Sequence, residues 1–221
     1  PSVIAAHVAT PGEPPNVIPA EKGNSSLAAV VAFREGGRPV VGRAAHDMLT
    51  TAPQRTITGI KRLLGRKSTS QAVKDLQLRV GFKIAEGSDG LAAIKLTGRN
   101  LRLPEVAAVL LDQTRRFAEK HLGQPVKKCV VAVPAYFTDL QKNAVRESAK
   151  LAGLEVKKLV HEPTAVALAY GYNRGGDARI VIIDMGGVRL DESVMEISGN
   201  VFDVVATRGD PKIRRSHSEK R

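Results

Sequence analysis

The chain has 221 residues, of which 43% are hydrophobic and 25% are charged. This composition supplies a hydrophobic core for one large or two small domains and excludes a disordered or collagen-like chain. The sequence has no apolar run near the roughly 20 residues of a membrane-spanning helix, and the residues from Pro1 to Ile4 lack the charged and apolar pattern expected of a secretory signal. We therefore expect a soluble α/β protein, in which the single cysteine, Cys129, is a buried strand residue rather than a nucleophile.

The net charge of +12 raises nucleic-acid binding as an alternative function. Part of this charge is local, since the segment Arg208–Arg221 holds six basic and two acidic residues. The other basic residues are spread in pairs, and no aromatic residues alternate with them as a base-stacking surface would need. The pattern favours a solvated basic surface with a basic tail over a nucleic-acid site.

The first hundred residues predict short strands and short helices. Up to about residue 41, β-rich runs alternate with turn-rich linkers, which is typical of antiparallel strands. A β-hairpin is expected further along, around the turn sequence at 87–90. The expected ranges are 43–51 and 57–64 for the helices, the second ending at Gly65, and 80–84 and 92–96 for the hairpin strands.

From Leu103 onward the elements become longer, and strands alternate with helices. The expected helices run from Pro104 until Gly123, from Thr138 to Ala152, and from Pro163 to Gly171. The expected strands cover 129–133, 156–160, 180–183, 193–197 and 201–206, the last two forming a hairpin. This alternation predicts a sheet with helices packed against it.

An apolar strand ends in an acidic residue followed by two glycines, in the segment Ile180–Gly187. Ligands of α/β sheets bind beyond the carboxyl ends of strands, where a carboxylate can hold Mg²⁺ through water. Glycines allow backbone N–H groups to approach a phosphate closely. Asp184, Gly186 and Gly187 are therefore candidate binding residues, although an ordinary turn fits the same pattern.

Two further segments carry candidate residues. Glu162 stands where a strand ends and a helix begins, so it either caps the helix or reaches an ion in a cleft. Lys61 is placed to neutralise a phosphoryl group or orient water, although a Lys-Arg pair on a helix is also typical of a solvated face. His161 is interpreted as a strand-end residue, because no second His or Cys lies at ligand spacing.

Taken together, these motifs resemble the DnaK-type (heat-shock 70 kDa) chaperone family in content, order and spacing. The matching segments are Lys61–Arg66, Leu122–Gly123, Val131–Gln141, Ala152–Val156, Val160–Gly171 and Asp184–Gly187. The resemblance covers about Val3 to Asp210 and implies the actin-like (ribonuclease H-like) ATPase fold, with two lobes facing a nucleotide cleft. On this basis the first lobe is expected over 1–174, with a peripheral subdomain at 31–106. The start of a truncated second lobe is expected over 175–210, and an aberrant basic tail over 211–221.

The resemblance also implies a role for individual residues. Lys61 matches the lysine that places the attacking water, and Glu162 and Asp184 match the acids that hold magnesium through water. Gly186 and Gly187 match the start of the second phosphate loop. Pro134 matches a proline that relays nucleotide state between the lobes, and Lys142 takes the place of the arginine that partners this proline in the family. The implied cofactor is ATP or ADP with Mg²⁺. The implied partners are a J-domain cochaperone and a nucleotide-exchange factor, with client peptides bound only through a domain absent from this sequence. The expected location is the cytoplasm.

Three departures from the family pattern lead us to expect that the chain does not hydrolyse ATP alone. The family's opening Asp-Leu-Gly-Thr-Thr loop is absent, Val188 and Arg189 replace a glycine and a threonine of the second phosphate loop, and the sequence after Asp210 diverges. A frameshift is our hypothesis for the divergent tail, with a degenerate paralogue as the alternative. The alternatives for function are a catalytically dead cochaperone-interaction module and the basic nucleic-acid binder considered above.

Overall fold

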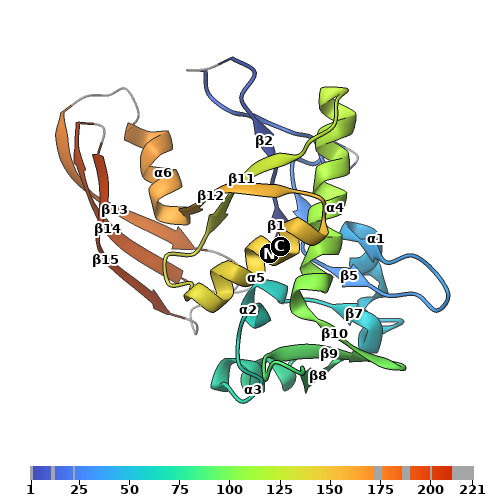
Figure 1. The fold of residues 1–221 in the computed structure, drawn as a ribbon. Coiled ribbons are helices and arrows are strands. Elements are labelled where there is room, and N and C mark those ends of the chain that lie inside the picture. The colour runs from blue at the N-terminus through green and yellow to red at the C-terminus, as the bar shows by residue number, and fades with distance from the viewer. Residues whose placement is uncertain are drawn as a thin grey trace, which may run out of the picture. The chain divides into compact units, whose positions relative to one another are not determined.

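The structure, a computed structural model, describes residues 2–10, 13–21, 23–171, 176–185, 190–199 and 201–210. The chain divides into two units (Figure 1). The N-terminal unit comprises residues 2–129 and 139–157, and the C-terminal unit comprises 130–138 and the described residues from Lys158 onward. The chain therefore enters the C-terminal unit, returns, and enters it again.

The N-terminal unit begins with short antiparallel strands, as the alternating pattern predicts. They are β1 (Ser2–Val3) paired with β4 (Leu27–Ala28), β2 (Ala6–His7) paired with β3 (Asn16–Val17), and β5 (Val31–Ala32) between β6 (Val40–Val41) and β7 (Thr56–Ile57). The first expected helix is confirmed as α1 (Gly42–His46), which continues into a 3₁₀ turn at Asp47–Leu49. A second 3₁₀ turn covers Pro53–Arg55. Val30, Ala32 and Ala45 form the buried cluster that holds α1 on the strands.

The expected helix over 57–64 is wrong in its first half. Thr56 and Ile57 form β7 and pair with β5, and helix α2 covers only Ile60–Leu63. The physical reason is Gly59, whose left-handed backbone (φ 67°) separates the strand from the helix. Gly65 follows α2 with a φ of 64°, as expected for the residue that ends this helix.

The rest of the N-terminal unit is a three-stranded antiparallel sheet and four helices, one of them α2. The predicted hairpin is confirmed as β8 (Lys83–Glu86) paired with β9 (Ala92–Leu96). Strand β10 (Arg99–Arg102) and helix α3 (Gln71–Gln77) were not predicted. The long helices are α4 (Leu103–Leu122) and α5 (Asp139–Leu151), which end before Gly123 and Gly153 with positive φ values, as expected. Phe82, Ile94 and Leu103 are buried in the core of this unit.

The strands β11 (Lys128–Val133) and β12 (Glu155–His161) form a two-stranded sheet. The unit boundary falls within both strands. Cys129 lies on β11 as predicted, but it is half-buried rather than buried, and burial raises the pKa of its thiol. The raised pKa keeps the thiol protonated, which agrees with the prediction that it is not a nucleophile.

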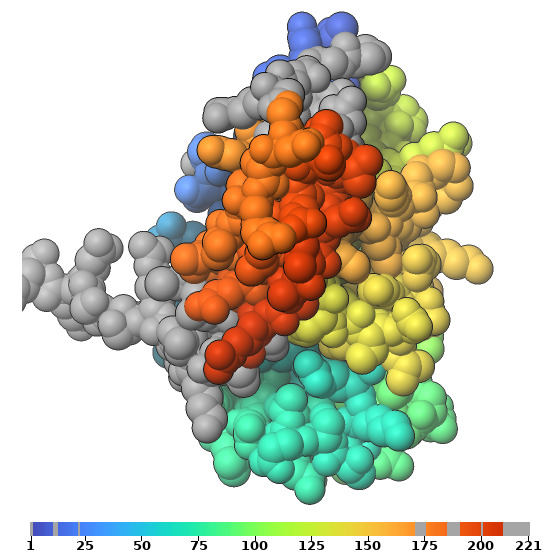
Figure 2. Space-filling model, turned by 90° about the vertical axis from the view of Figure 1, so that its left-hand side faces the viewer, coloured from blue at the N-terminus to red at the C-terminus, as the bar shows by residue number. Residues whose placement is uncertain are grey.

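In the C-terminal unit, helix α6 (Glu162–Gly171) packs on a sheet of three antiparallel strands (Figure 1). The strands are β13 (Asp177–Met185), β14 (Leu190–Ser198) and β15 (Val201–Asp210), so the predicted hairpin is confirmed and is longer than expected. Ala167, Ile182 and Met195 form the buried contact between helix and sheet. On β13, Val181 and Ile183 flank the buried Ile182, and their side chains are 65% and 64% exposed. Figure 2 shows the three strands of this sheet in orange to red.

In the part of the chain that the structure describes, no helix has the length and apolar character needed to cross a bilayer.

Candidate functional site

A small hollow in the C-terminal unit lies where several elements end. Its volume is about 20 Å³, which is room for one or two water molecules. The loop after β11, the first turn of α6 and the strands β13, β14 and β15 all contribute to its wall. The lining residues are Pro134, Ala135, Tyr136, Glu162, Pro163, Val166, Ile182, Asp184, Asp191, Ser193 and Thr207.

Three of the lining residues are carboxylates: Glu162, Asp184 and Asp191. Asp184 and Asp191 lie directly opposite each other in the β13–β14 register. Like charges at directly opposed positions destabilise a sheet, and a bound cation reduces the repulsion between them. The electrostatics of the hollow therefore favour a cation.

Neutral oxygens complete the polar side of the wall. Ser193 is buried at 4% exposure, and its hydroxyl lies 3.0 Å from the hydroxyl of Thr207. Thr207 in turn donates to the backbone carbonyl of Glu192 at 3.4 Å. The apolar part of the lining comes from Pro163, Val166 and Ile182, and Ile182 lies directly opposite Ser193 in the β13–β14 register. The lining thus combines acidic side chains, two hydroxyl groups and apolar side chains.

The structure brings together three of the residues that the sequence analysis singled out. Pro134, Glu162 and Asp184 line the same hollow, although Glu162 and Asp184 belong to different motifs. Asp191 was not among the predicted site residues. Pairing of β13 with β14 in an antiparallel hairpin could have indicated this residue, because it places Asp191 directly opposite Asp184.

The other predicted site residues are not among the lining residues of this hollow. Lys61 is exposed on α2 and Lys142 is partly exposed on α5, both in the N-terminal unit. Gly186 and Gly187 lie outside the described residues, as do Val188, Arg189 and the tail from 211 to 221.

The two lysines of the N-terminal unit are carried by elements in close contact. A Cβ atom added at Gly65, directly after α2, would lie 2.6 Å from the Cα of Gln141 and 2.8 Å from the backbone carbon of Leu140. The turn that follows the Lys61 helix therefore sits directly on the backbone of α5, the helix that carries Lys142. Only glycine allows this approach.

A magnesium ion fits the acidic hollow only through additional ligands. Among the described residues, no group of three His, Cys, Asp or Glu side chains can hold a metal ion by itself. Mg²⁺ commonly keeps several waters and uses one or two carboxylates together with phosphate oxygens. The carboxylates of the hollow fit this arrangement rather than an all-protein cage.

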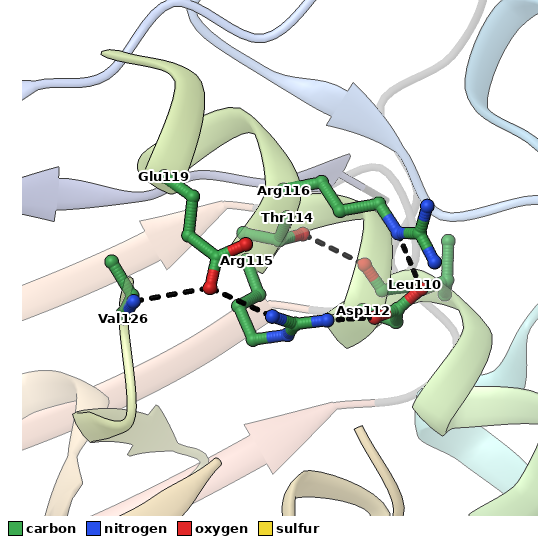
Figure 3. A network of polar contacts seen from close by, with 7 residues as sticks. All are labelled: Leu110, Asp112, Thr114, Arg115, Arg116, Glu119 and Val126. Carbon is green, nitrogen blue, oxygen red and sulfur yellow. Dashed lines mark hydrogen bonds and ion pairs between the residues drawn. The ribbon is translucent and has the colours of Figure 1, made fainter. Parts of the chain in front are cut away.

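A separate polar network stabilises the end of α4 in the N-terminal unit (Figure 3). Arg115 donates to Asp112 at 2.6 Å and to Glu119 at 2.7 Å. The amide N–H of Val126 donates to Glu119 at 3.1 Å and is the main cause that lowers the pKa of that carboxyl. Burial tends to raise the pKa of Asp112, but hydrogen bonds from Arg115 and Arg116 outweigh burial and hold this pKa below its usual range. The network ties the last turns of α4 to the segment that enters β11.

The fold and the hollow define an α/β protein with acidic side chains at the end of a strand, the position where such proteins bind ligands. The family model described as "Hsp70 protein" matches residues 2–214. This match covers nearly the whole chain, and the chain belongs to the Hsp70 family. The resemblance drawn from the motifs is thereby confirmed.

Membership in the family carries general properties. Hsp70 proteins are chaperones that bind nucleotide through an actin-like ATPase fold, and the mixed α/β architecture agrees with that fold. Members of the family generally work with J-domain cochaperones and nucleotide-exchange factors.

Proposed function

We propose that this chain contributes the acidic half of an ATP–Mg²⁺ site in a molecular chaperone. The observation that supports the proposal is that Glu162 and Asp184, from two separate family motifs, line one hollow together with Asp191. Mg²⁺, when bound, neutralises charge on the phosphates. Glu162 and Asp184 hold the ion through water, and Asp191 adds a third negative charge to the same wall.

The remaining roles rest on the family resemblance. Lys61 places the attacking water, and Gly186 and Gly187 approach the phosphates. In phosphoryl transfer the protein acts by positioning and by electrostatic stabilisation. Each of these residues therefore contributes by holding the water or the phosphates in position. The division into a first lobe over 1–174 and the beginning of a second at 175–210 belongs to this proposal.

The interlobe relay through Pro134 and Lys142 is also part of the proposal. What supports a role for Pro134 is that it lines the same hollow as Glu162 and Asp184. Lys142 lies one residue after Gln141, whose backbone contacts the Gly65 turn. The partners proposed for the chain are a J-domain cochaperone and a nucleotide-exchange factor, in the cytoplasm.

Hydrolysis by this chain is proposed to be negligible, because Val188 and Arg189 stand in the phosphate loop. A β-branched side chain occupies a position where the family has glycine, and close backbone approach to a phosphate favours glycine. We expect no measurable ATP turnover. Turnover at chaperone-like rates that disappears on Lys61→Ala would contradict this part of the proposal.

Calorimetry with ATP, with and without Mg²⁺, tests the site. We expect Mg²⁺-dependent binding to the wild-type chain, weakened at least about tenfold by Asp184→Asn, which corresponds to about 1.4 kcal/mol. Asp203→Asn on β15 is the matched control, because Asp203 is exposed and does not line the hollow. The absence of Mg²⁺-dependent binding, or equal binding by Asp184→Asn and wild type, would refute the proposal.

A catalytically dead interaction module is the second candidate function. The observation that favours it is the exposed apolar surface on β13, where Val181 and Ile183 are 65% and 64% exposed. Such a module predicts binding of a cochaperone that is indifferent to nucleotide. The same calorimetric experiment separates the candidates, since only the ATP site produces a Mg²⁺-dependent signal.

A further inference from the structure

The N-terminal unit contains a cavity that is larger than the acidic hollow. Its volume is about 190 Å³, and it lies where the turn between β8 and β9, the first turn of α4 and the helix α5 meet. Its lining shares no residue with that of the acidic hollow. A ligand of this cavity would therefore be held by residues other than the carboxylates of the proposed ATP site.

The inner part of the cavity is apolar and is lined by small side chains. Ala92, Ala93 and Ala144 are at most 6% exposed, and Leu103 is 1% exposed. An apolar cavity of about 150 Å³ accommodates a benzene molecule. The cavity between the hairpin turn and the two helices therefore has room for a compact apolar group of that size with a short polar extension.

The polar part of the lining carries an excess of negative charge. Three of the lining residues are charged, namely Asp89, Arg102 and Glu147, and Arg102 forms an ion pair with Glu147. The hydrogen bond and the charge of Glu147 are the main causes that raise the pKa of Arg102, and the charges of Glu105 and Asp89 act in the same direction. Three carboxylates thus act on one guanidinium, so the electrostatics of the cavity favour a cation.

Asp89 is the carboxylate that is placed to bind such a cation. One of its oxygens accepts the backbone N–H of Leu91 at 3.0 Å, and the N–H of Gly87 closes the same turn by donating to the carbonyl of Leu91 at 2.8 Å. A carboxylate has a second oxygen and further lone pairs that accept hydrogen bonds. The turn therefore holds the acceptor in position before a ligand arrives, which reduces the cost of ordering on binding.

We propose that this cavity binds a small organic cation, with a planar amidinium or guanidinium group on the carboxylate of Asp89 and a compact apolar group against Leu103 and the three alanines. A planar fork of N–H groups matches the geometry of a carboxylate. An inorganic cation would lose its water against the apolar part of the lining without gaining ligands there. The combination of one open carboxylate with a buried apolar lining thus selects an organic cation.

The test is a titration of the ¹⁵N-labelled full chain with benzamidine, followed by NMR. Benzamide and benzoate are the matched ligands, because they keep the ring and the size but are neutral and negatively charged. We expect saturable shifts of the backbone amides of Leu91, Ala92, Leu103 and Ala144 at about millimolar benzamidine. Benzamide and benzoate should bind at least about tenfold more weakly.

Two variants separate the charge of the cavity from its shape. Asp89→Asn changes an exposed side chain and should weaken benzamidine binding at least about tenfold. Ala144→Leu fills the cavity without changing a charge and should abolish binding, with circular dichroism as the check that this variant is folded. Asp47→Asn is the control, because Asp47 is exposed and does not line the cavity, and it should bind benzamidine as wild type does.

Three results would overturn the proposal. They are equal binding of the three ligands, equal affinity of wild type and Asp89→Asn for benzamidine, and shifts confined to amides outside the cavity. The titration contains no ATP and no Mg²⁺, so its outcome is independent of the proposed nucleotide site.

Discussion

Replacing Gly65 with alanine tests the closest backbone contact in the N-terminal unit. The backbone at Gly65 has a φ of 64°, a left-handed conformation that costs an L-residue about 1–2 kcal/mol. The new Cβ would also lie 2.6 Å and 2.7 Å from the Cα and N atoms of Gln141. These are backbone atoms, so α5 or the turn has to move, and forced overpacking costs about 1–3 kcal/mol. We expect Gly65→Ala to lose about 2–5 kcal/mol of unfolding free energy.

Gly123→Ala is the matched control for this prediction. Gly123 has nearly the same φ, 68°, and no atom lies within 4 Å of the position that its Cβ would take. This variant has the cost of the left-handed backbone without the steric clash, so we expect a loss of about 1–2 kcal/mol. Urea denaturation followed by circular dichroism measures both variants. Equal losses for Gly65→Ala and Gly123→Ala would refute the reasoning, because the contact with α5 would then contribute nothing.

Two further predictions concern charges. Arg115→Met removes the donor that holds Asp112 and Glu119 (Figure 3), so it should destabilise the chain at neutral pH. Folding lowers the pKa values of both carboxyl groups. Their contribution to the free energy of unfolding is therefore fully present at a pH above their pKa values in the unfolded chain, which are near 4. This contribution is lost as the pH falls through the lowered pKa values of the folded chain. The stability difference between wild type and Arg115→Met should therefore shrink below about pH 4, and a difference constant with pH would contradict the assignment. Asp184→Asn removes the repulsion between the charges of Asp184 and Asp191. In the absence of metal, this variant should therefore raise the free energy of unfolding by about 0.5 kcal/mol. A lower melting temperature than wild type would show that the two carboxylates do not repel each other.

Local patterns in the sequence were sufficient for the longer elements. The helices α4, α5 and α6 and the hairpin of β14 and β15 follow from apolar periodicity and from turn residues, which depend only on neighbouring positions in the chain. The shorter elements were less predictable. The range 57–64 was assigned to one helix, because the pairing of Thr56 and Ile57 with β5 is a long-range contact.

The sequence by itself determined the family of this protein, because its motifs are contiguous runs whose residues and order can be read directly. It also identified Glu162 and Asp184 as separate candidates. Only the tertiary structure decided that these two residues share one hollow, that Asp191 faces it as well, and that Asp89 and Glu147 line one cavity. The physical reason is that burial and packing between distant segments set these distances, whereas spacing along the chain does not.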